Sequence, residues 1–148
     1  MIDLTQDYAD VFSTDADGNR VTRPVCHDYA SGGRDAHGVW YTPDGSELWM
    51  VNRASSDGIV IDAGTDEVID TIEWTGRSPD ILTFSPDGRF AFVTLRGPVQ
   101  RSGPHAIAGD TPGVSIIDVA TREVREILVP DPERRESDFH GIGMRRLR

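Results

Sequence analysis

Lysine is absent from this chain of 148 residues, so all 15 of its basic residues are arginines. With 25 acidic residues, the formal net charge is −10. Binding to a nucleic-acid backbone requires a concentrated positive face, and here only the C-terminal end, 134–148, is locally basic. Arginines in such a stretch are typical of a solvated surface. We therefore expect no nucleic-acid partner.

Cysteine and long apolar runs are scarce as well. The single cysteine, Cys26, has no partner within the chain, so no internal disulfide stabilises the fold. No apolar stretch has the length of a membrane span, and residues 1–7 lack the basic and apolar segments of a secretory signal. We expect neither a membrane span nor a signal peptide in this chain. Its cellular location stays open on these grounds.

The chain does contain internal repeats. Residues 42–51 return 43 positions later as 85–94, and each copy begins with Thr or Ser followed by Pro-Asp-Gly. A second motif, at 61–68, returns 56 positions later at 117–124 and has a weaker copy at 15–21. The second shift is the longer of the two, which indicates an insertion inside the second unit. The chain is therefore a tandem array.

Each repeat unit is predicted to form four short strands. In the first unit, β-branched and aromatic residues occupy 39–42 and 47–52. The Pro-Asp-Gly between them fits a tight turn, because proline fixes φ and glycine accepts a positive φ. Two further strands are expected at 58–62 and 67–74. No segment shows the apolar period of a helix, so the fold class is all-β with antiparallel units.

A period of 40 to 45 residues with four strands per unit is typical of a β-propeller, whose blades pack around a central channel. In this interpretation residues 1–148 form one partial propeller domain with about two complete blades and a partial blade at each end. Its parts are a half blade at 8–26, a blade at 37–74, a blade at 80–129 with a loop insertion at 96–112, and the first strand of the next blade at 140–148.

Four short motifs follow one another in the first complete blade: His-Gly-Val at 37–39, Thr-Pro-Asp-Gly at 42–45, Trp-Met-Val-Asn at 49–52 and Val-Ile-Asp at 60–62. Their order resembles the YVTN-family β-propeller repeat, and the resemblance covers 37–129 well and 8–26 weakly. That repeat occurs in surface-layer proteins, in secreted or periplasmic proteins and, in divergent form, in the propeller domains of nitrous oxide reductase and haem-d-type nitrite reductase. The resemblance implies a periplasmic or extracellular location. It also implies that further blades or self-association cover the two end faces, because propellers of this family have more blades.

Propeller geometry predicts one functional face. The loops that enter the first strand of each blade lie opposite the Pro-Asp-Gly turns, near the mouth of the channel, and the insertion lies on the same face. The repeat register places His37, Asp80 and His140 at one equivalent position on this face. Six residues are the resulting candidates for ligand binding: Arg34, His37, Arg77, Asp80, His105 and His140.

Two chemistries are open to these residues. His37, Asp80 and His140 form a candidate transition-metal site, because two imidazoles and a carboxylate are suitable ligands for zinc, copper or iron. Alternatively the histidines only cap the loops through hydrogen bonds, since no His-x-x-x-His or Cys-x-x-Cys motif is present. Likewise, Arg34 and Arg77 either hold an anion or form salt bridges with neighbouring aspartates.

Catalytic motifs are missing from the sequence. Ser31 lacks the Gly-x-Ser-x-Gly pattern of hydrolases, and no Ser, His and Asp residues are spaced as a catalytic triad. We therefore expect a non-catalytic binding scaffold, without a cofactor, that presents its loop face to a protein, a polymer or a small ligand. The alternative is a metal- or cofactor-dependent redox propeller resembling the domains of the two reductases named above.

Overall fold

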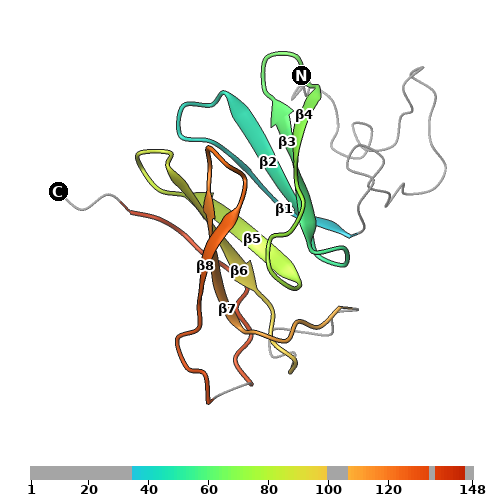
Figure 1. Cartoon of the computed structure of the whole chain (residues 1–148), viewed down its shortest axis with the longest axis vertical. Coiled ribbons are helices and arrows are strands. Elements are labelled where there is room, and N and C mark those ends of the chain that lie inside the picture. The colour runs from blue at the N-terminus through green and yellow to red at the C-terminus, as the bar shows by residue number, and fades with distance from the viewer. Residues whose placement is uncertain (1–34, 100–106, 134–135, 146–148) are drawn as a thin grey trace, which may run out of the picture.

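The computed structural model describes residues 35–99, 107–133 and 136–145, which form two four-stranded antiparallel sheets (Figure 1). Each sheet is a meander in which strands that follow one another in the sequence are neighbours. The strands of the first sheet are β1 (Ala36–Tyr41), β2 (Glu47–Asn52), β3 (Asp57–Asp62) and β4 (Val68–Ile72). Those of the second are β5 (Pro79–Phe84), β6 (Phe90–Leu95), β7 (Gly113–Asp118) and β8 (Val124–Leu128).

The all-β prediction with four antiparallel strands per sheet is confirmed for the described residues, although the two sheets do not close into a ring. The half blade predicted at 8–26 lies outside the described residues. Residues 136–145 contain no strand, and 146–148 lie outside the described part, so the strand predicted at 140–148 stays a prediction. The described part of the chain contains no helix with the length and hydropathy needed to span a membrane.

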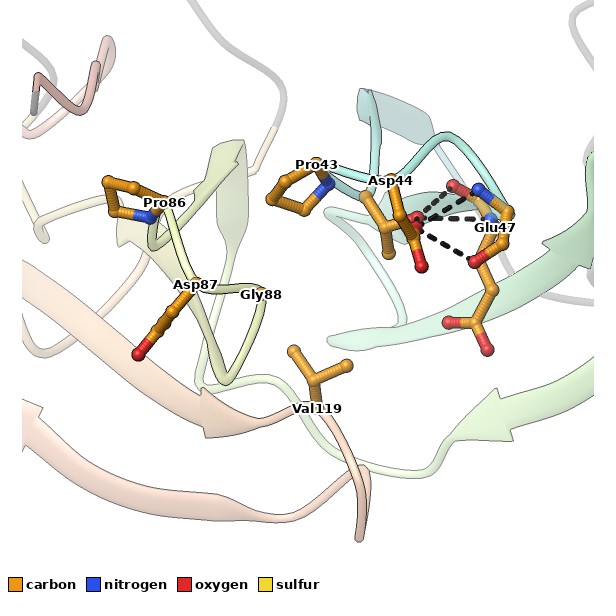
Figure 2. A pocket seen from close by; sticks show the side chains of 9 residues that line it. Pro43, Asp44, Glu47, Pro86, Asp87, Gly88 and Val119 are labelled. Carbon is orange, nitrogen blue, oxygen red and sulfur yellow. Dashed lines mark hydrogen bonds between the residues drawn. The ribbon is translucent and has the colours of Figure 1, made fainter.

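The two Pro-Asp-Gly turns form the end of the sheets opposite the predicted functional face. Gly45 and Gly88 both have positive φ, 74° and 72°, as these tight turns require. In the first turn Asp44 accepts hydrogen bonds from the Thr42 hydroxyl at 2.7 Å and the Ser46 hydroxyl at 2.8 Å. These bonds, with the Ser46 backbone N–H, lower the pKa of Asp44 to about 2, the Thr42 bond contributing most. The turns line a cavity of about 440 Å³ (Figure 2).

The hydrophobic core lies between the sheets. One face of the first sheet packs on the second, and the buried cluster consists of Trp49, Val51, Val60, Ile72, Leu82, Phe84, Ala91, Val93 and Ile117. Trp49 is fully buried and meets the Phe84 ring edge-on, with 5.2 Å between ring centroids. Its indole N–H donates to Glu47 at 2.8 Å, and Arg122 both pairs with Glu47 at 2.6 Å and stacks over the indole.

The two sheets approach most closely where β1 crosses β5, near the start of both strands. Gly38 lies at this crossing, and a Cβ added there would collide with the backbone carbonyl oxygen of Asp80. Glycine is therefore needed at residue 38 for the backbones to come this close. The crossing brings His37, the neighbour of Gly38, next to Asp80.

Candidate functional site

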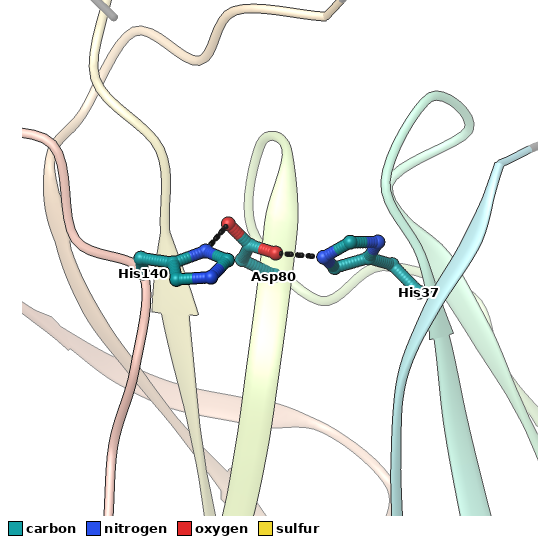
Figure 3. Close-up of side chains that lie close together, drawn as sticks. All are labelled: His37, Asp80 and His140. Carbon is teal, nitrogen blue, oxygen red and sulfur yellow. Dashed lines mark hydrogen bonds and ion pairs between the residues drawn. The ribbon is translucent and has the colours of Figure 1, made fainter. Parts of the chain in front are cut away.

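His37, Asp80 and His140 form one cluster at the start of β1 and β5 (Figure 3). The Asp80 carboxylate lies between the two imidazoles. Its Oδ1 is 2.5 Å from His37 Nε2, and its Oδ2 is 2.8 Å from His140 Nδ1. The Asp80 side chain is fully buried, whereas the side chains of His37 and His140 are 29% and 49% exposed. The carboxylate is thus buried between the two imidazoles, which are themselves partly exposed to solvent.

The repeat explains why these residues meet. His37 and Asp80 each lie two residues after a residue with positive φ. These residues are Asp35, with a φ of 61°, and Ser78, with a φ of 53°. The carbonyls of Asp35 and Ser78 accept equivalent hydrogen bonds, from the backbone N–H groups of Arg53 at 2.8 Å and Arg96 at 3.0 Å. The same entry turn therefore leads into both first strands, and it gives the side chain two residues later the same direction.

His140 is held at the cluster by β6. The Thr94 hydroxyl donates a hydrogen bond of 2.7 Å to the backbone carbonyl of His140. Arg96, which follows β6, lies 2.9 Å from His140 through its Nη1 atom and donates from that atom to Asp80 Oδ2 at 2.5 Å. The segment 136–145 therefore contributes its histidine through contacts with the second sheet.

Arg53 and Arg96, 43 residues apart, surround the buried carboxylate. Arg53 pairs with Asp35 through Nε at 2.8 Å and Nη2 at 3.2 Å, and its Nη1 is 3.8 Å from Asp80 Oδ1. Arg96 pairs with Asp138 through Nε at 2.9 Å and Nη2 at 3.0 Å. Each guanidinium thus has an aspartate of its own and reaches Asp80 with a further N–H group.

The insertion between β6 and β7 covers Arg96. A Cβ added at Gly109 would collide with the carbonyl oxygen of Arg96, and one added at Gly97 would collide with that of Ser137. These two glycines are joined by a backbone hydrogen bond of 3.1 Å. The described ends of the insertion thus pack closely on the backbone of Arg96, whose side chain is only 1% exposed.

The electrostatics of the cluster are nearly balanced. Among the described residues, the three carboxylates of Asp35, Asp80 and Asp138 face the two guanidiniums of Arg53 and Arg96, so these groups carry a formal charge of −1 when the imidazoles are neutral. Burial lowers the pKa of His37, and the charge of Asp80 opposes this effect without overcoming it. Asp80 Oδ1 is buried, and its close contact with His37 Nε2 at 2.5 Å lacks the alignment of a hydrogen bond.

The other predicted site residues lie elsewhere. Arg77 is on the surface with 67% of its side chain exposed, and it forms an ion pair of 3.8 Å with Asp110 of the insertion. Of the two alternatives considered for Arg77, the structure shows a salt bridge, but its partner is Asp110 and not Asp80, whose carboxylate pairs with the buried Arg96. Arg34 and His105 lie outside the described residues.

Sequence reasoning missed four charged residues of the cluster: Asp35, Arg53, Arg96 and Asp138. The signal was present in the repeat. The 43-residue shift that relates His37 to Asp80 also relates Arg53 to Arg96, and Asp-x-His-Gly occurs both at 35–38 and at 138–141. Applying the register to every charged residue, and not to the histidines alone, would have found all four.

Comparison with protein-family models gave no match, and neither did comparison with curated proteins. Among solved structures, the chain is similar to the Cps50 (Swd1) β-propeller domain of Myceliophteria thermophila, with 13% identity and a TM-score of 0.49. It is also similar to dihydro-haem d1 dehydrogenase NirN in complex with DHE, with 17% identity and a TM-score of 0.48, and to Kuenenia stuttgartiensis hydrazine synthase, with 20% and 0.41.

These similarities cover 66%, 70% and 71% of this chain but only 26%, 19% and 37% of the three other chains. The chain therefore spans between about a fifth and two fifths of their length. With TM-scores below 0.5 and identities of 20% or less, the similarities decide neither a family nor a function.

Proposed function

We propose that the chain is part of a β-propeller and acts as a non-catalytic binding scaffold whose ligand contacts the Asp80-centred cluster. The propeller arrangement is supported by two meanders of equal topology that stack face to face, with β1 against β5. It is supported further by the position of His140, which stands in the repeat where the first strand of a third unit begins. In a propeller these first strands surround the channel, so the cluster lies at the channel mouth.

One observation carries the binding role: His37, Asp80 and His140, which the repeat register of the sequence makes equivalent, meet in a single cluster. The buried carboxylate and guanidiniums hold the two imidazoles in place, and the imidazoles are exposed enough to touch a ligand. A polar group fixed in this way loses little conformational entropy on binding. The cluster therefore has the character of a preorganised recognition site.

Charge favours a neutral or cationic ligand. The chain carries a formal charge of −10, and the cluster itself carries −1 with neutral imidazoles. Arg77, which we considered for anion binding, forms an ion pair with Asp110 and lies on the surface. A basic or uncharged segment of a protein or polymer meets these conditions, whereas an anion is repelled by the field of the whole chain.

A selection experiment tests the binding role without knowledge of the natural ligand. A random peptide library displayed on phage is panned on the full chain in the presence of EDTA, and the affinity of enriched peptides is measured for two variants. We expect the double variant His37→Ala/His140→Ala to bind them at least about tenfold more weakly. Arg77→Ala, a change on the same face away from the cluster, is expected to bind them like the original chain.

Two results would overturn the proposal. One is that no peptide is enriched. The other is that enriched peptides bind the double histidine variant as tightly as the original chain, which would place binding elsewhere. Circular dichroism of each variant verifies that the sheets are retained, so that a loss of affinity reports on the cluster itself.

A further inference from the structure

The donor atoms of the cluster are those of a metal centre. One nitrogen from each of His37 and His140 and one carboxylate oxygen of Asp80 all lie within 4.8 Å of one another. Two imidazole nitrogens and one carboxylate oxygen suit borderline ions such as Zn²⁺ and Cu²⁺. With bonds of about 2.0–2.1 Å, tetrahedral ligand atoms lie roughly 3.3 Å apart. The observed contacts, 2.5 Å between Asp80 Oδ1 and His37 Nε2 and 2.8 Å between Asp80 Oδ2 and His140 Nδ1, need to open by less than about 1 Å to admit an ion. Arg96 Nη1, which lies 2.9 Å from His140 Nδ1, has to move away from that nitrogen when the ion binds.

A second observation is the state of the Asp80 carboxylate. Its Oδ1 atom is buried and accepts no well-aligned hydrogen bond, whereas buried carboxylate oxygens are normally satisfied. Its Oδ2 atom accepts from Arg96 Nη1 at 2.5 Å. Metal-bound carboxylates are typically oriented by such a donor on the second oxygen. The side chain thus presents Oδ1 to His37 Nε2 at 2.5 Å, while Oδ2 faces both Arg96 Nη1 and His140 Nδ1.

The two nearby arginines do not exclude a cation. Arg53 is paired with Asp35 and Arg96 with Asp138, each at two donor atoms. The negative charge of Asp80 is therefore not balanced by these two arginines. A bound divalent ion would change the formal charge of the cluster from −1 to +1. A single carboxylate is a poor site for Ca²⁺ or Mg²⁺, which prefer several oxygen ligands.

We propose that His37, Asp80 and His140 bind one divalent transition-metal ion per chain, of the Zn²⁺ or Cu²⁺ class. The proposal rests on the proposed function in that both place the ligand at this cluster. His37 and His140 bind through the nitrogens that now face Asp80, with the ring proton on the other nitrogen. A fourth coordination position faces the exposed side of the imidazoles and is open to water or to a donor group of a partner.

Zn²⁺ alone is the probe for the test, and its affinity is measured by competition with a chelating dye. We expect one Zn²⁺ per full chain and no displacement by a 100-fold excess of Ca²⁺. The variant His37→Ala/His140→Ala is expected to lose at least about 100-fold in affinity. The control is His27→Ala, which removes a histidine that is not among the candidate ligand-binding residues and is expected to bind Zn²⁺ like the original chain.

The single variant His37→Gln guards against misfolding, because glutamine retains a hydrogen-bonding amide near Asp80. We expect it to unfold in urea close to the original chain and yet to bind Zn²⁺ about tenfold or more weakly. Equal Zn²⁺ affinity of the His37→Ala/His140→Ala variant and the His27→Ala control, displacement by Ca²⁺, or no Zn²⁺ binding by the original chain would each refute the metal site.

The two proposals fail separately. A chain that binds its selected peptides in EDTA but takes up no Zn²⁺ refutes the metal site and leaves the scaffold standing. A chain that binds Zn²⁺ at the cluster but selects no peptide there refutes the scaffold and leaves the metal site standing.

Discussion

Replacing Asp80 with asparagine removes the one charge that both imidazoles and Arg96 share, at nearly constant side-chain volume. The side chain is fully buried, and its oxygens lie 2.5 Å from both His37 Nε2 and Arg96 Nη1 and 2.8 Å from His140 Nδ1. The amide group of asparagine keeps one acceptor oxygen but turns an N–H₂ group toward one of these donors. The variant therefore weakens contacts on both sides of the cluster.

The size of the effect follows from what remains paired. Breaking a buried ion pair costs about 3–5 kcal/mol when it leaves a charge uncompensated. In Asp80→Asn, Arg96 retains Asp138 and Arg53 retains Asp35, so neither guanidinium is left without a carboxylate. What is lost is the charged character of the contacts, and a hydrogen bond to a charged group contributes about 1.5–3 kcal/mol. We expect the free energy of unfolding to fall by about 2–3 kcal/mol.

Urea unfolding followed by tryptophan fluorescence measures this loss. For an m-value of about 1.5 kcal/mol per M, the midpoint should fall by roughly 1.5–2 M with an unchanged slope. Arg77→Ala removes an exposed ion pair and should change the free energy of unfolding by less than about 1 kcal/mol.

A double-mutant cycle makes the test sharper. In Asp80→Asn/Asp138→Asn, Arg96 loses both of its carboxylates, so the combined loss should exceed the sum of the two single losses. A midpoint for Asp80→Asn within about 0.3 M of the original, or strict additivity in the cycle, would refute the view that Asp80 and Asp138 share one buried guanidinium.

Two further predictions concern the framework around the site. Gly38→Ala should lower the free energy of unfolding in urea by about 1–3 kcal/mol, because the added Cβ collides with the backbone carbonyl of Asp80. Gly141→Ala, in the second copy of the Asp-x-His-Gly motif, adds its Cβ in open space and should have little effect. Equal effects of the two substitutions would contradict the close contact between β1 and β5. Asp44 should titrate with a pKa of about 2, below its ordinary 3.8, so its stabilising contribution is complete above pH 4 and is lost as the pH falls toward 2. Thr42→Val should raise that pKa by removing its largest cause, and an unchanged midpoint in carboxyl ¹³C NMR would refute this assignment.

The sequence was most informative where local chemistry and the repeat agree. Pro-Asp-Gly favours a tight turn, and short runs of apolar residues such as the one around Trp49 favour a strand, so two four-stranded antiparallel units were predictable. The register then placed His37, Asp80 and His140 together without any knowledge of long-range contacts. In a repeat protein, proximity in space can be predicted from the sequence, because equivalent positions of adjacent units are expected to lie on the same side of the fold.

The polar partners were harder to predict. Arg53 and Arg96 directly follow strands, where an arginine is usually a solvated end, and nothing local indicates that Arg96 is buried. The insertion packs on the backbone of Arg96, and Arg77 forms an ion pair with Asp110 of the same insertion. Contacts of an insertion have no counterpart in the other unit, so the repeat register gives no information about them.

The central claim is that three successive repeat units converge on one ligand-binding cluster. The most direct measurement is a long-range ¹H–¹⁵N spectrum of the histidine imidazoles while Zn²⁺ is added to the full chain, which has four histidines. We predict that the signals of His37 and His140 move together and saturate at one equivalent of Zn²⁺, while that of His27 stays in place. Signals of His37 and His140 that respond at different Zn²⁺ concentrations, or that stay in place while the signal of His27 moves, would contradict this claim.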